Sequence, residues 1–277
     1  MVSMSTVPNV AFIGGGNMAR ALIGGMTSKG HPGERIWVAD SSPAKAQSLN
    51  ERFGVRVASS LGEAVNNAQV VVLAVKPQAI DALVDELAQR DLVQGRLFIS
   101  IAAGVAVSRL QARLGKACAV VRLMPNMPVS IGYGMCGLYA NAHTSSEQKR
   151  LAMAIAQSCG DCLEVHEEAA IDSVTALSGS GPAYFFLVME AMIRAGTRLG
   201  LSVPDARRLT CQAARGAAQL VLLGDEDPTE LRRQVTSAGG TTQAAIDLLL
   251  HADVPSLVEA AVTAAHDRAV ELGRLAG

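Results

Sequence analysis

Three consecutive glycines, Gly14 to Gly16, separate a short apolar run from a helix-like segment near the N-terminus. The stretch Phe12-Ile-Gly-Gly-Gly-Asn-Met-Ala19 matches the pattern G-x-G-x-x-A at Gly14, Gly16 and Ala19. In this pattern the first glycine allows a tight turn, the second lets the backbone approach a ligand closely, and the small third residue lets the helix pack against the strand. The order strand, glycine turn, helix therefore predicts a Rossmann-like unit whose helix N-terminus binds the pyrophosphate of a dinucleotide.

Through residue 166 the chain alternates short β-branched runs with helix-like stretches, which is typical of a doubly wound α/β domain. The run Val70–Val75 is apolar at every position, as a parallel strand covered by helices on both faces requires. We expect strands at Asn9–Gly14, Arg35–Asp40, Val70–Val75, Leu97–Ile101 and Cys118–Leu123, with weaker signals at Val55–Val57, Cys136–Tyr139 and Leu163–Val165. The helices expected between the first five are Asn17–Lys29, Pro43–Arg52, Gln78–Gln89 and Val105–Leu114.

From residue 167 strand signals disappear, and alanine, leucine and arginine dominate. The fold prediction is α/β: an N-terminal Rossmann-like NAD(P)-binding domain, residues 1–166, plus a C-terminal all-α domain, residues 167–277. The chain is 49 % apolar and only 18 % charged, an excess that predicts a subunit interface. The expected C-terminal helices, four of which begin at proline as the first helical position favours, are Ala169–Leu177, Pro182–Leu199, Pro204–Leu222, Pro228–Gln234, Thr242–Leu250 and Pro255–Leu275.

Charge, apolar runs, cysteines and histidines indicate which partners and which cellular compartment to expect. The net charge is −1 with no block of Lys or Arg, which argues against a nucleic-acid partner. Uninterrupted apolar runs fall short of the roughly 20 residues that span a bilayer, and no basic leader precedes a long apolar core, so we expect no membrane and no signal peptide. Five scattered cysteines fit a cytoplasmic protein, with Cys159 and Cys162 as ordinary, partly buried thiols. The five histidines show no paired ligand spacing, so we expect no metal site.

Three further loops are expected at the carboxyl ends of strands, where α/β proteins bind ligands. After the second strand, Asp40 favours a free ribose 2′-hydroxyl, as in NAD, whereas Ser41 and Ser42 are suited to donate to a 2′-phosphate, as in NADP. The sequence does not decide between these two cofactors. Ala74-Val-Lys-Pro77 and Ile101-Ala-Ala-Gly104 follow the next two strands of the sheet and are placed to line a dinucleotide, with Lys76 either facing it or solvated.

Two loops of glycine and hydroxyl residues interrupt the helical half. Leu177-Ser-Gly-Ser-Gly-Pro-Ala-Tyr184 runs into an apolar helix, with Ser180 or Gly181 as the expected N-cap and Pro182 at the first position. This loop either serves packing and capping or turns a helix N-terminus toward a nicotinamide. Val235-Thr-Ser-Ala-Gly-Gly-Thr-Thr242 exposes several backbone N–H groups at a helix start, and such a nest binds a carboxylate or phosphate.

Together these motifs resemble those of the pyrroline-5-carboxylate reductase family over essentially the whole chain. The motifs that carry the resemblance are the Gly14–Ala19 turn, Ala74-Val-Lys-Pro77, Ala102-Ala-Gly104, Met124-Pro-Asn-Met-Pro128, Ser178-Gly-Ser-Gly-Pro-Ala-Tyr184 and Val235-Thr-Ser-Ala-Gly-Gly-Thr-Thr242, the last close to the family signature. The chain departs from the family at Ala238, where proline is usual, and at Met127, where threonine is common.

The resemblance implies NAD(P)H-dependent reduction of (S)-1-pyrroline-5-carboxylate to L-proline, the last step of proline biosynthesis. It implies NADPH as the cofactor, with NADH possible, and a homodimer that intertwines through the helical domain, in some members as a decamer, a pentamer of dimers. The expected cofactor contacts, with Ser41 added from the ribose argument, are Gly14, Gly15, Gly16, Asn17, Met18, Ser41, Ser42, Ala74, Val75, Lys76, Pro77, Ala102 and Ala103. The expected substrate contacts are Ser237, Gly239, Gly240, Thr241 and Thr242.

The implied reaction explains why the second loop contains no ordinary acid or base. Hydride transfer to a C=N bond needs an electrophilic carbon, and a protonated imine supplies one, so the protein contributes orientation and electrostatics. We expect the Gly239 and Gly240 amides and the Ser237 hydroxyl to hold the substrate carboxylate. Thr242 is the expected catalytic residue, through a hydrogen bond to the ring nitrogen.

Two other functions compete with this interpretation. A β-hydroxyacid dehydrogenase also joins a Rossmann-like domain to a helical one, but it carries a catalytic lysine in the helical domain, and no lysine follows Lys149 in this chain. A protein that binds NAD(P) without chemistry would not need a second anion nest. Both alternatives are therefore weaker than the reductase.

Overall fold

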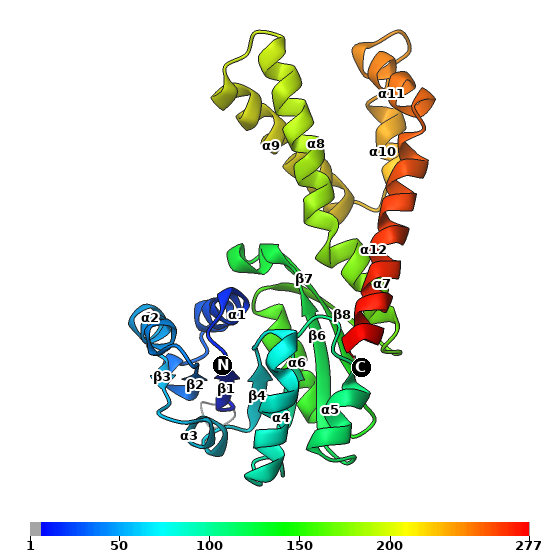
Figure 1. Cartoon of the computed structure of the whole chain (residues 1–277). Coiled ribbons are helices and arrows are strands. Elements are labelled where there is room, and N and C mark those ends of the chain that lie inside the picture. The colour runs from blue at the N-terminus through cyan, green and yellow to red at the C-terminus, as the bar shows by residue number, and fades with distance from the viewer. Residues whose placement is uncertain (1–6, 277) are drawn as a thin grey trace. The chain divides into compact units, whose positions relative to one another are not determined.

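The computed structural model describes residues 7–276 and divides into two compact units (Figure 1). The first unit contains the described residues up to Ser180 together with the chain from Ala265 onward, and the second unit is Gly181–Ala264. The chain therefore leaves the first unit once and returns to it near its C-terminal end.

The first unit is built on an eight-stranded sheet with the order β3-β2-β1-β4-β5-β6-β7-β8. The strands from β3 to β6 in this order are parallel, β7 is antiparallel to β6, and β8 is parallel to β7. This topology confirms the Rossmann-like prediction, and all eight predicted strand regions form strands. They are β1 (Val10–Ile13), β2 (Ile36–Ala39), β3 (Arg56–Val57), β4 (Val70–Leu73), β5 (Leu97–Ser100), β6 (Ala119–Pro125), β7 (Gly134–Ala140) and β8 (Gly160–Val165).

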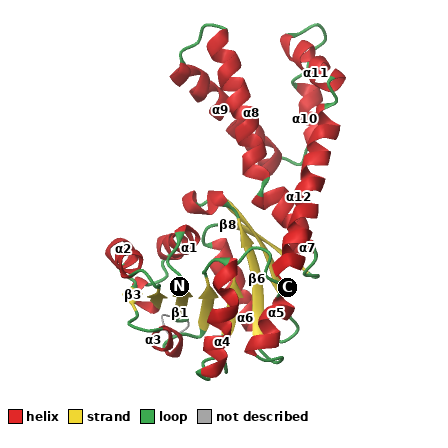
Figure 2. Ribbon diagram, in the orientation of Figure 1, coloured by secondary structure: helices red, strands yellow, loops and turns green. Residues whose placement is uncertain are grey.

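Helices cover both faces of this sheet, as Figure 2 shows. Alternate residues of one strand supply the two cores: Val10 and Phe12 pack into one, and Ala11 and Ile13 into the other. Burying a large apolar side chain contributes about 1.5–3 kcal/mol, so uniformly apolar strands stabilise this layered arrangement. The helices of the first face are α1 (Asn17–Ser28), α2 (Pro43–Phe53) and α6 (Ser146–Gln157), and those of the second are α3 (Leu61–Asn66), α4 (Ile80–Gln89) and α5 (Val107–Leu114).

Short elements complete this unit, and two of its helices were not predicted. The 3₁₀ turns are η2 (Gly33–Arg35), η3 (Pro77–Ala79) and η4 (Met127–Ile131). The helix α3 has only six residues, too few for a clear helical period. The helix α6 begins with a capping box, in which Ser145 and Gln148 each accept a hydrogen bond from the other's backbone N–H. The Ser-x-x-Gln spacing of this capping box is visible in the sequence and could have located the start of α6.

The structure corrects the predicted loop at Leu177–Tyr184. Here α7 (Ala170–Val174), a π-helical turn η5 (Thr175–Gly179) and α8 (Gly181–Arg198) form one continuous helix, Ala170–Arg198. The Ser180 N–H donates to the Thr175 carbonyl at 2.9 Å, which continues the π-helical turn up to the start of α8. A Cβ on Gly179 would lie 3.2 Å from the Met124 Cε, which favours close packing as the reason for this glycine.

The second unit is helical and has almost no core of its own. It contains α8, α9 (Val203–Leu223), α10 (Pro228–Gln234), α11 (Thr241–His251) and the first part of α12 (Val254–Ala276). The only buried residues among 181–264, all of which the structure describes, are Gly181, Ala206 and Thr210. Large apolar side chains are instead exposed along its helices, among them Phe185, Phe186, Leu187, Val188, Met192, Leu209, Leu220, Leu222, Leu248 and Leu257.

One helix, Ala170–Arg198, is long and apolar enough to cross a bilayer by length and composition, and the bent pair formed by α11 and α12 also meets these criteria. The expectation of no membrane partner stays a prediction, since these criteria describe length and composition alone. Such helices also form the buried contacts of oligomers, and an exposed apolar surface of this kind indicates an interface. The second unit therefore depends on a partner surface.

We expect the protein to sediment as a dimer or larger species at micromolar concentration, because the second unit cannot bury its apolar side chains alone. Replacing two of them, Phe185→Glu with Leu187→Glu, should cost the assembly at least about 2 kcal/mol, or about 30-fold in its dissociation constant. Sedimentation velocity measures this, with Val57→Glu as the control because Val57 is an exposed apolar residue of the sheet unit. A wild-type protein that remains a folded monomer would contradict the prediction.

Candidate active site

The glycine turn after β1 is held against the segment that follows β4. Gly14 has a φ of +106°, and a Cβ on it would lie 2.6 Å from the Ala74 carbonyl oxygen. The Gly14 N–H donates to the Ala39 carbonyl at 2.8 Å, which continues the pairing of β1 with β2. Both the backbone conformation and the close approach require glycine at this position.

Beyond this turn, the N-terminus of α1 offers unpaired donors to an anion. The Arg20 N–H donates to the Gly16 carbonyl at 2.9 Å, which closes the first helical turn. The amides of Asn17, Met18 and Ala19 have no acceptor among the described residues. A Cβ on Gly16 would meet no atom within 4 Å, so the space beside these amides is open. Free amides and open space at a helix N-terminus fit the pyrophosphate of a dinucleotide.

Next to the turn lies a cavity of about 430 Å³ at the carboxyl ends of β1, β2 and β4. It brings together three of the predicted cofactor residues, Gly14, Ser41 and Val75, with Asp40 and the segment 58–61. Its walls combine apolar side chains with serine hydroxyls and the carboxylates of Asp40 and Glu86, and such a mixture suits the nucleoside half of a cofactor. Of the other predicted residues, Lys76 is exposed and Pro77 opens η3.

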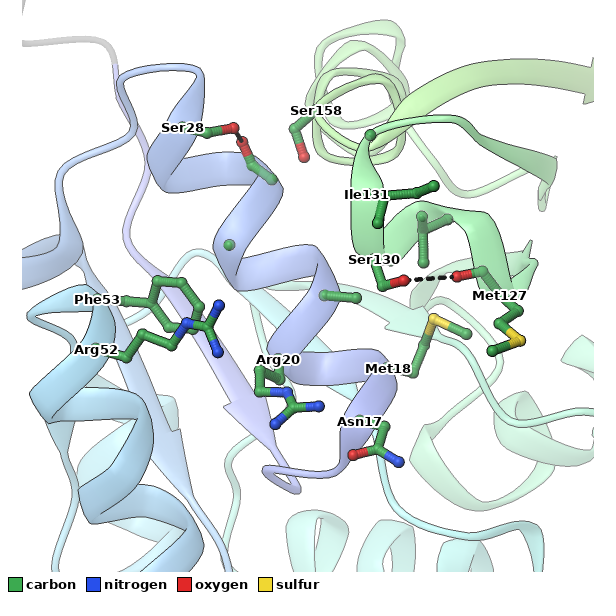
Figure 3. Close-up of a pocket in the computed structure, with 15 residues that line it drawn as sticks. Asn17, Met18, Arg20, Ser28, Arg52, Phe53, Met127, Ser130, Ile131 and Ser158 are labelled. Carbon is green, nitrogen blue, oxygen red and sulfur yellow. Dashed lines mark hydrogen bonds between the residues drawn. The ribbon is translucent and has the colours of Figure 1, made fainter. Parts of the chain in front are cut away.

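A second cavity, of about 660 Å³, lies along α1 (Figure 3). Asn17 and Met18, both predicted cofactor residues, line it together with Met127, Ser130 and other residues of η4. Figure 3 shows Met18 on the side of α1 that faces Ser130 and Met127. The structure thus places the start of α1 beside the segment that follows β6, at the same edge of the sheet as the nucleoside cavity.

The loop after β5 contains the last two predicted cofactor residues. Ala102 is buried, and its N–H lies 3.4 Å from the Ser100 hydroxyl, whereas Ala103 is exposed. Gly104 has a φ of +73°, and a Cβ on it would lie 3.6 Å from the backbone of Leu272 near the end of α12. The C-terminal end of the chain therefore packs against this loop.

Sequence reasoning missed Asn126 as a residue that organises this region. Its amide donates to the carbonyl and the hydroxyl of Ser178, both at 3.2 Å, and its side-chain oxygen accepts the Met135 N–H at 2.9 Å. Asn126 thereby joins the end of β6 to the π-helical turn and to β7. In the sequence, Asn126 stands out only as a polar residue within Met124-Pro-Asn-Met-Pro128. The motif does not indicate which residues it bonds to.

A second network behind β6 was also missed. The buried Arg122 pairs with Glu168 at 3.1 Å and with Asp172 at 3.3 Å. Glu168 in turn accepts the Val107 N–H at the start of α5, at 2.7 Å. Because breaking a buried ion pair leaves an uncompensated charge, this network fixes α5 and α7 relative to the sheet.

The segment Ser237–Thr242 forms the start of α11. Gly239 has a φ of +73°, which favours glycine, and a Cβ on Gly240 would lie 2.6 Å from the Ser237 hydroxyl. The Gly240 N–H donates to the Ser237 carbonyl at 3.0 Å, and the Gly239 N–H donates to the Gln243 side chain at 2.7 Å.

The two glycine amides are therefore engaged within the loop, a feature that sequence reasoning did not predict. The amides of Thr241, Thr242 and Gln243 have no acceptor among the described residues, because they precede the first helical bond, Ala244 N–H to the Gly240 carbonyl. These three donors lie at the positive end of the helix dipole and suit a carboxylate. The assignment of Ser237, Gly239, Gly240, Thr241 and Thr242 as substrate contacts stays a prediction.

The cysteines contribute no activated thiol to these cavities. Burial raises the pKa of the Cys136 thiol to about 12 and that of the Cys162 thiol to about 12. Burial also raises the pKa of Cys159. Thiols with raised pKa values are poor nucleophiles at neutral pH, which agrees with the structural interpretation of Cys159 and Cys162.

Comparison with known proteins places these features in a family. A family model described as NADP oxidoreductase coenzyme F420-dependent matches residues 9–104, and one described as pyrroline-5-carboxylate reductase dimerisation matches residues 168–272. The pyrroline-5-carboxylate reductase of Pseudomonas aeruginosa is 47 % identical over 274 residues, which cover 99 % of this chain and 100 % of that protein. That of Pasteurella multocida is 41 % identical and covers 96 % of this chain and 98 % of its own.

Solved structures give the same relationship. The pyrroline-5-carboxylate reductase of Coxiella burnetii superposes with a TM-score of 0.91 at 42 % identity, covering 96 % of this chain and 99 % of that one. The pyrroline carboxylate reductase of Plasmodium falciparum, solved with NADP bound, has a TM-score of 0.86 at 28 % identity. The match covers 96 % of this chain and 98 % of that one.

The fold, the free amides of α1 and these matches define an NAD(P)-dependent oxidoreductase with a helical dimerisation domain. The open space at Gly16 and the unpaired amides that follow it fit the NADP group that the family implies. Within that class, the chain belongs to the pyrroline-5-carboxylate reductase family.

Substituting Gly14→Ala should raise the dissociation constant for NADPH at least about tenfold, because the new Cβ would displace the Ala74 carbonyl. Gly30→Ala is the matched control, since Gly30 also has a positive φ, of +91°, but a Cβ there meets no atom within 4 Å. Both variants should lose about 1–2 kcal/mol of stability from the left-handed conformation. Fluorescence titration and thermal unfolding measure the two effects, and equal NADPH affinities for the two variants would exclude the steric argument.

Proposed function

We propose that this chain reduces (S)-1-pyrroline-5-carboxylate to L-proline, the last step of proline biosynthesis, with NADPH as the hydride donor and NADH as an alternative donor. The observation that carries the proposal is the presence of unpaired backbone amides at two helix starts, those of α1 and α11, in a chain of this family. One suits the cofactor pyrophosphate and the other suits the carboxylate of the substrate.

The cofactor end of the site belongs to the first unit. The residues proposed to contact the cofactor there are those predicted from sequence: Gly14, Gly15, Gly16, Asn17, Met18, Ser41, Ser42, Ala74, Val75, Lys76, Pro77, Ala102 and Ala103. When bound, the reduced nicotinamide supplies the hydride. The free amides at the start of α1 support pyrophosphate binding, and the cavity at the ends of β1, β2 and β4 supports nucleoside binding.

The residues proposed to bind the substrate lie around the start of α11, in the second unit. We assign the substrate carboxylate to the free amides of Thr241 and Thr242 and to the Ser237 hydroxyl. The Gly239 amide joins them once the Gln243 side chain, which now accepts its hydrogen bond, turns away. Main-chain donors fixed by two glycines are preorganised, so they lose little conformational entropy when the substrate binds.

Thr242 is the proposed catalytic residue. It lies in the first turn of α11 and is half-buried, and its hydroxyl accepts a hydrogen bond from the N–H of the protonated ring nitrogen. The imine carbon of a protonated substrate is already electrophilic, so the hydroxyl orients and stabilises the ring rather than transferring a proton to it. Orientation of reacting groups at about 3–3.5 Å supplies several kcal/mol of barrier lowering.

We further propose a homodimer as the functional unit and a pentamer of dimers as the larger assembly. The exposed apolar helices of the second unit support the dimer. The functional division of the chain is proposed at residues 166 and 167, just before the dimerisation match begins at residue 168. A cytoplasmic location is supported by the described cysteines, all of which are free thiols.

Replacing the hydroxyl in Thr242→Ala should lower kcat with pyrroline-5-carboxylate about 10- to 100-fold, since a hydrogen bond to a charged group is worth about 1.5–3 kcal/mol. The fold should remain intact. Initial rates of NADPH oxidation, followed by absorbance, measure the effect. The control is Thr263→Ala, because the Thr263 hydroxyl only donates to its own helix backbone, at Glu259. Wild-type turnover in Thr242→Ala would remove Thr242 from the mechanism.

A further inference from the structure

The end of β2 carries two opposing signals for cofactor choice, an acid at Asp40 and serines at Ser41 and Ser42. In dinucleotide-binding folds, an acid at this position reads the ribose 2′-hydroxyl and repels a 2′-phosphate. The structure shows what the Asp40 carboxylate contacts in this chain. Its Oδ2 accepts the Gly15 N–H at 2.7 Å, and its Oδ1 accepts the Ser42 N–H at 2.7 Å.

These two hydrogen bonds give Asp40 a structural role. They connect the glycine turn after β1 to the turn after β2, two segments that are 25 residues apart in the chain. Each carboxylate oxygen accepts a short charge-assisted hydrogen bond from a rigid main-chain donor, which fixes the orientation of the group. The negative charge is thereby directed toward backbone amides of the glycine turn.

A lysine in the first turn of α2 supplies a positive charge beside the glycine turn. Lys45 lies in the first turn of α2, where its N–H donates to the Ser42 carbonyl at 3.1 Å. A Cβ on Gly15 would lie 3.6 Å from the Lys45 Cβ, so the lysine side chain begins beside the glycine turn. It is exposed, and no carboxylate among the described residues pairs with it.

Two arginines of the same region are engaged by aromatic rings. Arg56 stacks over the Trp37 ring at 5.1 Å, and Arg52 over the Phe53 ring at 5.3 Å. The nearby Glu63 carboxylate is turned onto the backbone N–H and the hydroxyl of Ser59. The Lys45 side chain thus begins beside the Ser41–Ser42 turn, and its positive charge suits a phosphate monoester.

We propose that Lys45 selects the 2′-phosphorylated cofactor by placing its ammonium group against the 2′-phosphate, and that Asp40 is a positioning residue for the glycine turn, not the residue that reads the ribose. This inference rests on the proposed function for the identity of the cofactor. It assigns the preference for NADPH over NADH to a residue of α2, and it gives Asp40, at the end of β2, no part in that preference.

The test measures cofactor binding without substrate, on the full chain, by titrating NADPH and NADH against protein fluorescence. The wild type should bind NADPH more tightly than NADH. In Lys45→Ala, the NADPH dissociation constant should rise about tenfold while that for NADH changes less than about twofold. Lys45→Arg should keep the preference, and Lys29→Ala, an exposed lysine at the end of α1, should leave both constants unchanged.

The Asp40 arm separates positioning from ribose recognition. In Asp40→Asn both dissociation constants should rise by similar factors, so their ratio stays within about twofold of the wild type. The matched control is Asp161→Asn, because Asp161 also accepts a backbone N–H, from Cys162 at 2.7 Å, on β8. Where Asp40→Asn fails to fold, Asp40→Ser keeps one acceptor for the Gly15 or Ser42 N–H and carries the same expected ratio.

Three outcomes overturn the proposal. The first is a wild type without preference for NADPH, the second is a Lys45→Ala variant that weakens both cofactors equally, and the third is an Asp40 variant that weakens only NADH. The failure of the proposed function is a different result. It would be seen as no NADPH oxidation with pyrroline-5-carboxylate while the binding preference and its dependence on Lys45 remain.

Discussion

The close approach of Gly14 to the Ala74 carbonyl is the constraint on which the cofactor end of this protein depends. A Cβ on Gly14 would lie 2.6 Å from that oxygen, so there is no room for a side chain. The contact sets the direction in which the chain leaves β1, and it thereby decides which amides remain free. Gly15 turns its N–H to Asp40, whereas the amides at the start of α1 point into open space. One steric contact therefore both builds the turn and creates its binding capacity.

The second unit follows from a different constraint, since nothing within it covers its apolar side chains. With only Gly181, Ala206 and Thr210 buried among residues 181–264, its helices gain little from intramolecular burial. At about 25 cal/mol per Å² of apolar surface, the missing stabilisation has to come from association. Folding of this unit and its assembly are therefore coupled.

Much of the fold was predictable from the sequence, because apolar runs such as Val70–Val75 and the glycine pattern at Gly14–Ala19 are local signals. The π-helical turn at Thr175–Gly179 was not, since serines and glycines there indicate a loop unless the packing of Met124 against Gly179 is known. The partners of Asn126 were equally hidden, because its hydrogen bonds to Ser178 join residues 52 apart.

The same difference applies to the candidate site. The sequence predicted an anion nest at Ser237–Thr242, but it did not reveal that the Gln243 side chain accepts the hydrogen bond of the Gly239 N–H. Nor did it reveal the bonds from Asp40 to Gly15 and Ser42, which change the meaning of an acid that pattern rules associate with NAD. Residue types were predictable, and their hydrogen-bond partners were not.

The chain path through the two units has a consequence for biosynthesis. Residues from Ala265 onward belong to the first unit, although the whole of Gly181–Ala264 is made before them. The backbone near Leu272, which packs against Gly104, is synthesised after the whole of Gly181–Ala264. The nucleotide-binding unit thus cannot reach its final form early in translation, and its completion is delayed until the oligomerising helices are already available to partner chains.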